Sequence, residues 1–470
     1  MHRTVPTTRS AIFALSLTAI LFGCAAEEAP LASSPNVVII VLDTVRADHL
    51  SSYGYELDTT PNIDALCDTA VRYTRCRATG PWTLPSHASI FTGLFAFQHH
   101  ARTEVVDGGR LGELPLSQDH VTLAEVLGEV GYRTGAFVAN AAYLREEFQL
   151  DQGFESYVVK REPALEKNPT AFEWLGEGTE PFFMFLNYMD AHRPYNTRPF
   201  NGKRADLPLP NGIVPSAALL DELYNEVMGR GLPPTEEVVQ ELRMRYDIGI
   251  ANADLAVGEV IEYLKKLGQW ENTLLIVTSD HGEFFGEHGL VEHSKDIYEE
   301  VLHVPLVCKY PETDLGSVND NLISLADIPG IVLEVLPAEF ADSMREQFPL
   351  DLGRNFSIAE ASFSRGKDLS LFGERFRRER RVIYFGKHKF IRSSDGQHEL
   401  YDLDLDPSEK SNLYAIEPKV AERLSQQMLT FMADNPGVLE RAAAPKLSAE
   451  GLKALHDLGY LGNDESESDD

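Results

Sequence analysis

Two aspartates and a histidine end apolar runs of this sequence and have the donor types of a divalent-metal site. Asp43 ends the run "NVVIIVLD", and Asp280 and His281 lie at the end of "NTLLIVTSDHG". Each aspartate alone is more typical of a loop or a helix cap, but the three residues together predict one metal ion. Thr83 is a candidate fourth ligand, because a metal lowers the pKa of a coordinated hydroxyl and polarises the ester that it faces.

Thr83 stands at the start of "TLPSHASIFTG", which has the end signals of a helix. Pro85 falls near the first turn and Gly93 at the stop. The helix dipole and the free N–H groups at such a position favour an alkoxide or a bound oxyanion. This stretch alone favours a turn or cap threonine, and only the metal-ligand set makes Thr83 a candidate nucleophile.

A second group of polar residues consists of Asp190, His192, His293 and Lys295. These residues have two possible functions: they hold a second metal, or they protonate a leaving group and bind an anion. For His192 in "DAHRPY", a hydrogen-bonded structural histidine is an equally good interpretation.

Four apolar runs must position these residues, and they end at Asp43, Asn140, Asp190 and Asp280. Near-continuous apolar runs of this length are typical of strands buried on both faces of a parallel sheet. Amphipathic helical patterns lie between the runs, so the sequence predicts an α/β layered fold. Ligands of such folds bind outside the carboxyl ends of the strands, where all four runs place a polar residue.

The N-terminal residues 1–24 have the pattern of an export signal, with a basic start and the apolar run "AIFALSLTAILFG". The run ends in "LFGC", which resembles the lipobox of bacterial lipoproteins. We expect Cys24 to be lipidated and residues 25–35 to be a linker. The chain would then be exported and lipid-anchored to a bacterial membrane, on its periplasmic or cell-surface side. The alternative is an ordinary cleaved signal.

The rest of the chain divides by composition into three parts. We expect a catalytic domain at 36–340, with a polar insertion at 193–240, and a smaller antiparallel α+β subdomain at 341–445. The stretch "RRVIYFGKHKFIRSSDGQHELYDLD" predicts a hairpin that turns at "SSDG". Residues 446–470 are predicted to be an acidic tail.

The net charge of −31 argues against nucleic acid as a partner, because phosphate binding needs a basic surface. Cys67, Cys76 and Cys308 form no CxxC motif, which argues against a thiolate metal site. Cys67 and Cys76 are close enough in sequence to pair, and the sequence leaves that disulfide open.

Several blocks, in this order, resemble those of sulfatase-like enzymes of the alkaline phosphatase superfamily: "NVVIIVLDTVRADHLSSYGY", "TLPSHASIFTG", "FLNYMDAHRPY" and "NTLLIVTSDHGEFFGEHG". The resemblance covers roughly residues 36–415. It implies a three-layer fold with a mostly parallel central sheet, a smaller C-terminal sheet, and a metal-held nucleophile that attacks a sulfate or phosphate ester. By matching position, the implied metal ligands are Asp43, Asp280 and His281, the nucleophile is Thr83, and the substrate or leaving-group residues are His192 and His293.

The departures from the family pattern are informative. Standard sulfatases have Cys or Ser at the nucleophile, converted to formylglycine, then Pro and Arg; here the residues are Thr83 and His87. The second of two paired aspartates is Thr44, and Asn140 stands in the block where the family usually carries Lys and His. Loss of a carboxylate favours zinc or manganese over calcium. A threonine on such a metal resembles the superfamily's phosphodiesterases and phosphoethanolamine or glycerol-phosphate transferases.

The leading hypothesis is therefore a metal-dependent hydrolase of sulfate or phosphate esters, with phosphoester or phosphodiester hydrolysis favoured. Thr83 attacks, His192 or His293 serves as acid, and His87 completes the catalytic set. The predicted substrate-binding residues are Asn140, Asp190 and Lys295. The alternatives are a phosphoryl-group transferase acting on envelope glycans or lipids, and a non-catalytic binding protein on a sulfatase fold.

Overall fold

The computed structural model describes residues 34–106, 111–199, 207, 217–345, 348, 354–362, 369, 372–373, 376–437, 442–458 and 460. The predicted signal, Cys24 and most of the linker lie outside these residues and stay predictions. Within the described part of the chain, every helix is too short or too polar to cross a lipid bilayer.

An eight-stranded sheet forms the centre of the molecule, in the order β12-β2-β11-β8-β1-β7-β5-β6. All strand pairs are parallel except the two that β11 makes. The four predicted strands are confirmed, and they lie side by side as β8, β1, β7 and β5. The strands are β1 (Asn36–Leu42), β2 (Val71–Arg77), β5 (Arg133–Val138), β6 (Ser156–Val159), β7 (Phe182–Tyr188), β8 (Thr273–Thr278), β11 (Leu306–Lys309) and β12 (Ser317–Ser324).

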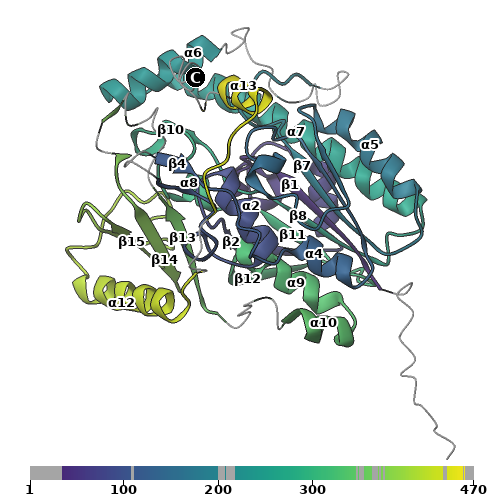
Figure 1. Cartoon of the computed structure of the whole chain (residues 1–470). Coiled ribbons are helices and arrows are strands. Elements are labelled where there is room, and N and C mark those ends of the chain that lie inside the picture. Colours follow the sequence, from purple (N-terminus) through teal and green to yellow (C-terminus); the bar gives the residue numbers. More distant parts are fainter. Residues whose placement is uncertain are drawn as a thin grey trace, which may run out of the picture.

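Helices cover both faces of this sheet (Figure 1). Alternate residues of β1 enter two different apolar clusters, so the strand is buried on both sides. One cluster includes helices α2 (Thr83–Thr92), α4 (Leu123–Glu129) and α9 (Ile328–Val335); the other includes α1 (Pro61–Cys67), α5 (Ala164–Gly176) and α7 (Glu236–Lys266). The predicted α/β layered fold with a mostly parallel central sheet is confirmed.

The approach of α7 to the carboxyl end of β7 depends on one glycine. A Cβ on Gly249 would lie 2.2 Å from the carbonyl oxygen of Asp190. The helix backbone therefore packs directly against the loop that carries Asp190 and His192, which fixes that loop at the edge of the sheet.

A smaller subdomain follows, with a four-stranded antiparallel sheet in the order β13-β14-β15-β16. Its strands are β13 (Phe356–Ala361), β14 (Arg380–Phe385), β15 (His388–Ser393) and β16 (Glu399–Asp402), and helix α12 (Pro418–Asp434) packs on them through Leu424 and Met428 (Figure 1). The predicted turn at "SSDG" lies between β15 and β16, which confirms the antiparallel subdomain.

The last described element is helix α13 (Ala449–Asp457), which lies within the stretch predicted to be an acidic tail. Ser448 caps the helix by accepting a hydrogen bond from the Gly451 amide, and Tyr460 beyond it is buried. Residues 461–470 lie outside the described part. The remaining short elements are α3 (Ala96–His99), α6 (Ala217–Tyr224), α8 (Glu299–Leu302), α10 (Ala338–Arg345), β3 (Thr103–Val105), β4 (Leu111–Glu113), β9 (Phe284–Phe285) and β10 (Val291–Glu292). Cys67, Cys76 and Cys308 are all free thiols.

Candidate active site

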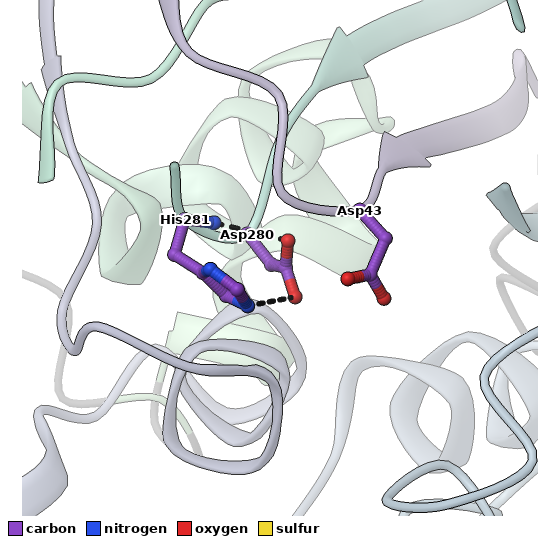
Figure 2. A group of neighbouring side chains, drawn as sticks. All are labelled: Asp43, Asp280 and His281. Carbon is purple, nitrogen blue, oxygen red and sulfur yellow. Dashed lines mark hydrogen bonds and ion pairs between the residues drawn. The ribbon is translucent and has the colours of Figure 1, made fainter. Parts of the chain in front are cut away.

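Three ligand side chains meet at the carboxyl end of the central sheet. Asp43 follows β1, and Asp280 and His281 lie just beyond β8; because β1 and β8 are paired in parallel, their ends are adjacent. The three ligand atoms lie within 4.8 Å of one another. Figure 2 shows the two carboxylates facing each other, with the His281 ring beside Asp280. This arrangement can hold one divalent cation.

The hydrogen bonding of these side chains fits a cation. Within the described part of the chain, Asp43 Oδ1, Asp280 Oδ2 and His281 Nε2 are buried and make no hydrogen bond. His281 Nδ1 donates to the Gly282 carbonyl oxygen at 2.9 Å, so Nε2 presents its lone pair. That lone pair faces Asp280 Oδ2 at 3.3 Å. Buried acceptors that face one another without a donor are costly, and a divalent cation would satisfy all three.

Burial sets the protonation of this group. Burial, and then repulsion by Asp280, raise the pKa of Asp43 to about 7. Burial also raises the pKa of Asp280 to about 7. Burial lowers the pKa of His281, which keeps the imidazole neutral and able to bind a metal. A cation would favour the ionised form of both carboxylates.

Thr83 is the first residue of α2 and is fully buried. The cap position before it belongs to Trp82, which makes no side-chain cap. The Thr83 hydroxyl accepts a hydrogen bond from Asn140 Nδ2 at 3.2 Å, and it interacts with Asp280 closely enough to lower the pKa of that carboxylate. The Thr83 hydroxyl therefore lies against the metal-ligand group.

Asn140 links this hydroxyl to the ligand group. Its Nδ2 also donates to Asp43 Oδ2 at 3.0 Å. Asn187, at the end of β7, donates from its own Nδ2 to the same carboxylate oxygen at 3.2 Å, and its Oδ1 accepts from the Asn140 amide at 2.9 Å. Two amides therefore hold one oxygen of Asp43 and leave the other free for a metal.

His87 and Thr44 stand at the positions where the family pattern is broken. His87 Nδ1 donates to the Thr83 carbonyl oxygen at 2.9 Å, and burial lowers the pKa of His87 to about 3, so the ring is neutral. Thr44 has φ of 64°, and its amide donates to Asp280 Oδ1 at 3.2 Å. The Thr44 hydroxyl donates to the Asp43 carbonyl oxygen at 2.7 Å, so Thr44 contacts the ligand group through both its amide and its hydroxyl.

His192 and His293 are brought together beside the ligand group by a third residue. The Nε2 atom of each histidine lies 3.0 Å from the hydroxyl of Tyr460. His293 Nδ1 lies 3.0 Å from Glu283 Oε1, and the His293 and His281 rings lie 4.5 Å apart. The two histidines therefore form a polar wall next to the metal-ligand group.

Asp190 and Lys295 have different surroundings. Asp190 Oδ2 accepts a hydrogen bond from the Ala164 amide at the start of α5, at 2.9 Å. Lys295 Nζ lies 3.5 Å from Glu292 Oε2 and 4.7 Å from the centre of the Tyr224 ring. Lys295 also lies within electrostatic range of Glu283, the partner of His293, whereas the side-chain hydrogen bond of Asp190 is made with α5.

Four residues of the site carried no separate prediction. Asn187 is an amide inside the apolar run "FFMFLNY", and Glu283 directly follows "SDHG", so each had a weak local signal. Tyr460 has no signal of this kind. Arg161 is exposed, yet it lies within electrostatic range of both Asp43 and Tyr460.

Comparisons with known proteins identify the family of this chain. A family model described as Sulfatase matches residues 35–338. Arylsulfatase K of Mus musculus is 24% identical, over 90% of this chain and 84% of that protein. The multifunctional alkaline phosphatase superfamily protein PehA of Trinickia caryophylli is 28% identical, over 65% of this chain and 74% of that protein.

A solved structure shows the same fold. The phosphonate monoester hydrolase of Agrobacterium radiobacter superposes with a TM-score of 0.65 at 21% identity, covering 85% of this chain and 96% of that chain. The sulfatase match spans more than half of the sequence and includes Asp43, Thr83, Asp280 and His281. The chain therefore belongs to the sulfatase family of the alkaline phosphatase superfamily.

Proposed function

We propose that this chain is a metal-dependent ester hydrolase in which Thr83 is the nucleophile, with phosphoesters or phosphodiesters favoured over sulfate esters. The observation that carries the proposal is the shared hydrogen-bonding of Asn140, whose one amide nitrogen binds both Thr83 Oγ1 and Asp43 Oδ2. A buried hydroxyl that shares a donor with a metal ligand is positioned for ionisation and attack.

The residues of the chain have separable tasks in this mechanism. A divalent cation bound by Asp43, Asp280 and His281 would lower the pKa of the Thr83 hydroxyl and offset the charge of the ester. Asn140 orients Thr83 Oγ1, and the free N–H groups at the start of α2 would favour an oxyanion bound at that end of the helix. In this proposal the proton for the leaving group comes from the cluster of His192 and His293, which lies beside the ligand group.

The choice of ester and metal rests on chemistry. Oxidation of a threonine side chain gives a ketone, so Thr83 cannot become the aldehyde that sulfatases of this family use. A threonine that takes the phosphoryl group directly needs no such modification. Two carboxylates and one imidazole suit zinc or manganese better than calcium. One relative is a phosphonate monoester hydrolase, which supports a phosphorus ester as substrate.

The test is hydrolysis of aryl phosphodiester, phosphomonoester, phosphonate and sulfate substrates by the purified protein, with zinc, manganese or calcium added. We expect phosphodiester turnover with zinc or manganese, and a loss of about 10³-fold or more in T83A with metal content retained. The matched control is T92A, because Thr92 is buried at the other end of α2 and donates to the Ala88 carbonyl. Full activity in T83A would remove Thr83 from the mechanism. Release of product only when an acceptor alcohol is present would favour the transferase.

A further inference from the structure

The two histidines beside the ligand group share the hydroxyl of Tyr460, a residue without an assigned role. That hydroxyl lies 3.0 Å from Nε2 of His192 and 3.0 Å from Nε2 of His293. All three side chains are at most 5% exposed. A phenol buried between two imidazoles beside a metal-ligand group has the placement of a proton-transfer residue.

The C-terminal segment that carries Tyr460 is fixed to the site by several contacts. Leu455 and Leu458 are buried in the apolar cluster that contains Trp82 and Tyr143. Tyr460 packs edge-on against Tyr143 at 4.9 Å between ring centres, and Tyr143 packs against Trp82 at 5.0 Å. Since Trp82 directly precedes Thr83, this stack of rings connects the phenol to the nucleophile.

Polar contacts hold the start of the same segment. The Ser448 hydroxyl donates to Glu147 Oε1 at 2.7 Å, and Arg145 Nη2 donates to the Ser448 hydroxyl at 3.2 Å. Both partners belong to the stretch that follows Asn140. The segment is therefore attached to the same loop region that positions the nucleophile.

The hydrogen bonds fix which histidine donates to the phenol. His192 Nδ1 donates to the Arg193 carbonyl oxygen at 2.9 Å, so its neutral ring has a lone pair at Nε2 and accepts the phenolic proton. A phenol has one proton, so the other histidine must donate to the phenolic oxygen. Nε2 of His293 therefore carries a proton, whether the proton shared between its Nδ1 and Glu283 belongs to the ring or to the carboxyl group.

We propose that Tyr460 is a catalytic residue, which protonates the leaving oxygen of the ester and is reprotonated by His293. This inference rests on the proposed hydrolase function and names the acid of that reaction. In this assignment His293 donates a proton to the phenolic oxygen after the phenol has lost its own. His192 accepts the hydrogen bond of the phenol before substrate enters.

Thr83 enters as the alkoxide, its proton having passed to solvent, and Oγ1 forms a bond to phosphorus or sulfur. The bond between the phosphorus or sulfur atom and the leaving oxygen breaks. The electron pair of this bond stays on the leaving oxygen, which takes the proton of the Tyr460 hydroxyl. The phenolic oxygen takes the Nε2 proton of His293. The proton shared with Glu283 lies on His293 Nδ1 at the end of this step, having moved from the carboxyl group if it began there, so the ring is neutral and Glu283 is a carboxylate. Water later cleaves the Thr83 ester.

The experiment compares Y460F with the wild-type protein on two phosphodiesters that differ in leaving group, one a nitrophenolate and one an aliphatic alkoxide. An aliphatic alkoxide is a strong base that needs a proton as it leaves, whereas nitrophenolate does not. We expect kcat/KM of Y460F to fall about 100-fold or more on the alkyl ester and less than about 3-fold on the nitrophenyl ester. Y132F is the matched control, because Tyr132 is buried and its hydroxyl donates to Pro35 outside the site.

Other outcomes overturn the inference. An equal loss of activity on both esters in Y460F, with metal content retained, would show that Tyr460 has only a structural role. Unchanged or increased activity would show that Tyr460 only blocks access to the site. In either case T83A shows whether the proposed function itself survives, since that variant must lose activity on both esters. Failure of the wild-type protein to hydrolyse either phosphodiester would reject this inference and the phosphodiester preference, whereas turnover of another ester of the substrate panel would still support the hydrolase.

Discussion

The metal-ligand group and the histidine pair are built in different ways. Asp43, Asn140 and Asp280 each follow a strand of the central sheet, so their positions are set by backbone pairing. His192 and His293 come from loops, and a tyrosine from a distant C-terminal segment joins them. The first region is thus part of the sheet, whereas the second depends on long-range side-chain contacts.

The largest effect should follow a change in the metal-ligand group at the end of the central sheet. We expect D43N to bind zinc or manganese more than about 100-fold more weakly and to lose activity in parallel. Loss of a residue that only hydrogen-bonds to a metal ligand already lowers metal affinity by up to about 100-fold. Without metal, the same variant should unfold at a higher temperature than the wild type at pH 8, because an amide removes the repulsion with Asp280. Metal analysis and thermal unfolding test both effects.

D254N is the matched control for that variant. Asp254 is also buried, but it accepts hydrogen bonds from the Asn62 and Ile63 amides of α1. Retention of metal in D43N would show that Asp43 is no ligand.

The second prediction concerns pH and metal together. The pKa values of Asp43 and Asp280 are each raised to about 7 without metal, so protons compete with the cation. Metal affinity should therefore fall as pH drops from 8 to 6. Below the pKa, each proton that the metal must displace lowers the affinity by about 10-fold per pH unit. Calorimetric titration with zinc or manganese at both pH values measures this.

The same two groups predict how stability depends on pH. In the unfolded chain their carboxyls ionise near the ordinary pKa of about 4. Between about pH 4 and 7 the folded protein binds more protons than the unfolded one, so the metal-free protein loses stability as pH rises through this range. Added metal should restore stability most at pH 8. A metal affinity that does not change with pH would contradict ionisation of this pair on binding.

The smallest effect is expected at Asp190, which sharpens the boundary of the site. Burial raises the pKa of Asp190 to about 7, and the side chain accepts from the first amide of α5. The side-chain oxygen of an asparagine at this position can still accept the hydrogen bond from the Ala164 amide, and the side chain carries no charge. D190N should leave kcat/KM within about 3-fold, since uncharged isosteres that keep a hydrogen bond cost little. It should raise the melting temperature at pH 8 by about 2–4 °C, and by less at pH 5.

Thermal unfolding at the two pH values tests this, with D342N as the exposed-carboxylate control. A fall of 100-fold in kcat/KM would instead support the predicted substrate-binding role of Asp190.

The metal-ligand group at the ends of the strands can be predicted from the sequence because the strands have a clear pattern. Strands buried on both faces need continuous apolar runs, and the polar residue that ends each run marks the carboxyl edge. Asn187 was missed because its amide lies within such a run, where its hydrogen-bond partners are invisible. The hydrogen bond between Asp190 and the first amide of α5 was not predicted, because nothing in the local pattern shows that α5 begins against this carboxylate.

The histidine pair was predictable only as two separate residues. Nothing near His192 or His293 indicates that Tyr460 lies between them, since that contact depends on the path of the C-terminal segment. The acid-rich end of the chain predicts a tail, yet Ser448 caps a helix and Leu455 is buried. A few apolar residues at helical spacing were enough to dock this segment.

The order of these residues along the chain has a consequence for synthesis. A ribosome makes Asp43, Thr83 and Asp280 first, and the segment that ends in Tyr460 long after them. A chain that stops before that segment contains every ligand of the cation but leaves His192 and His293 without their shared hydroxyl. Completion of the site is therefore tied to completion of translation through residue 460.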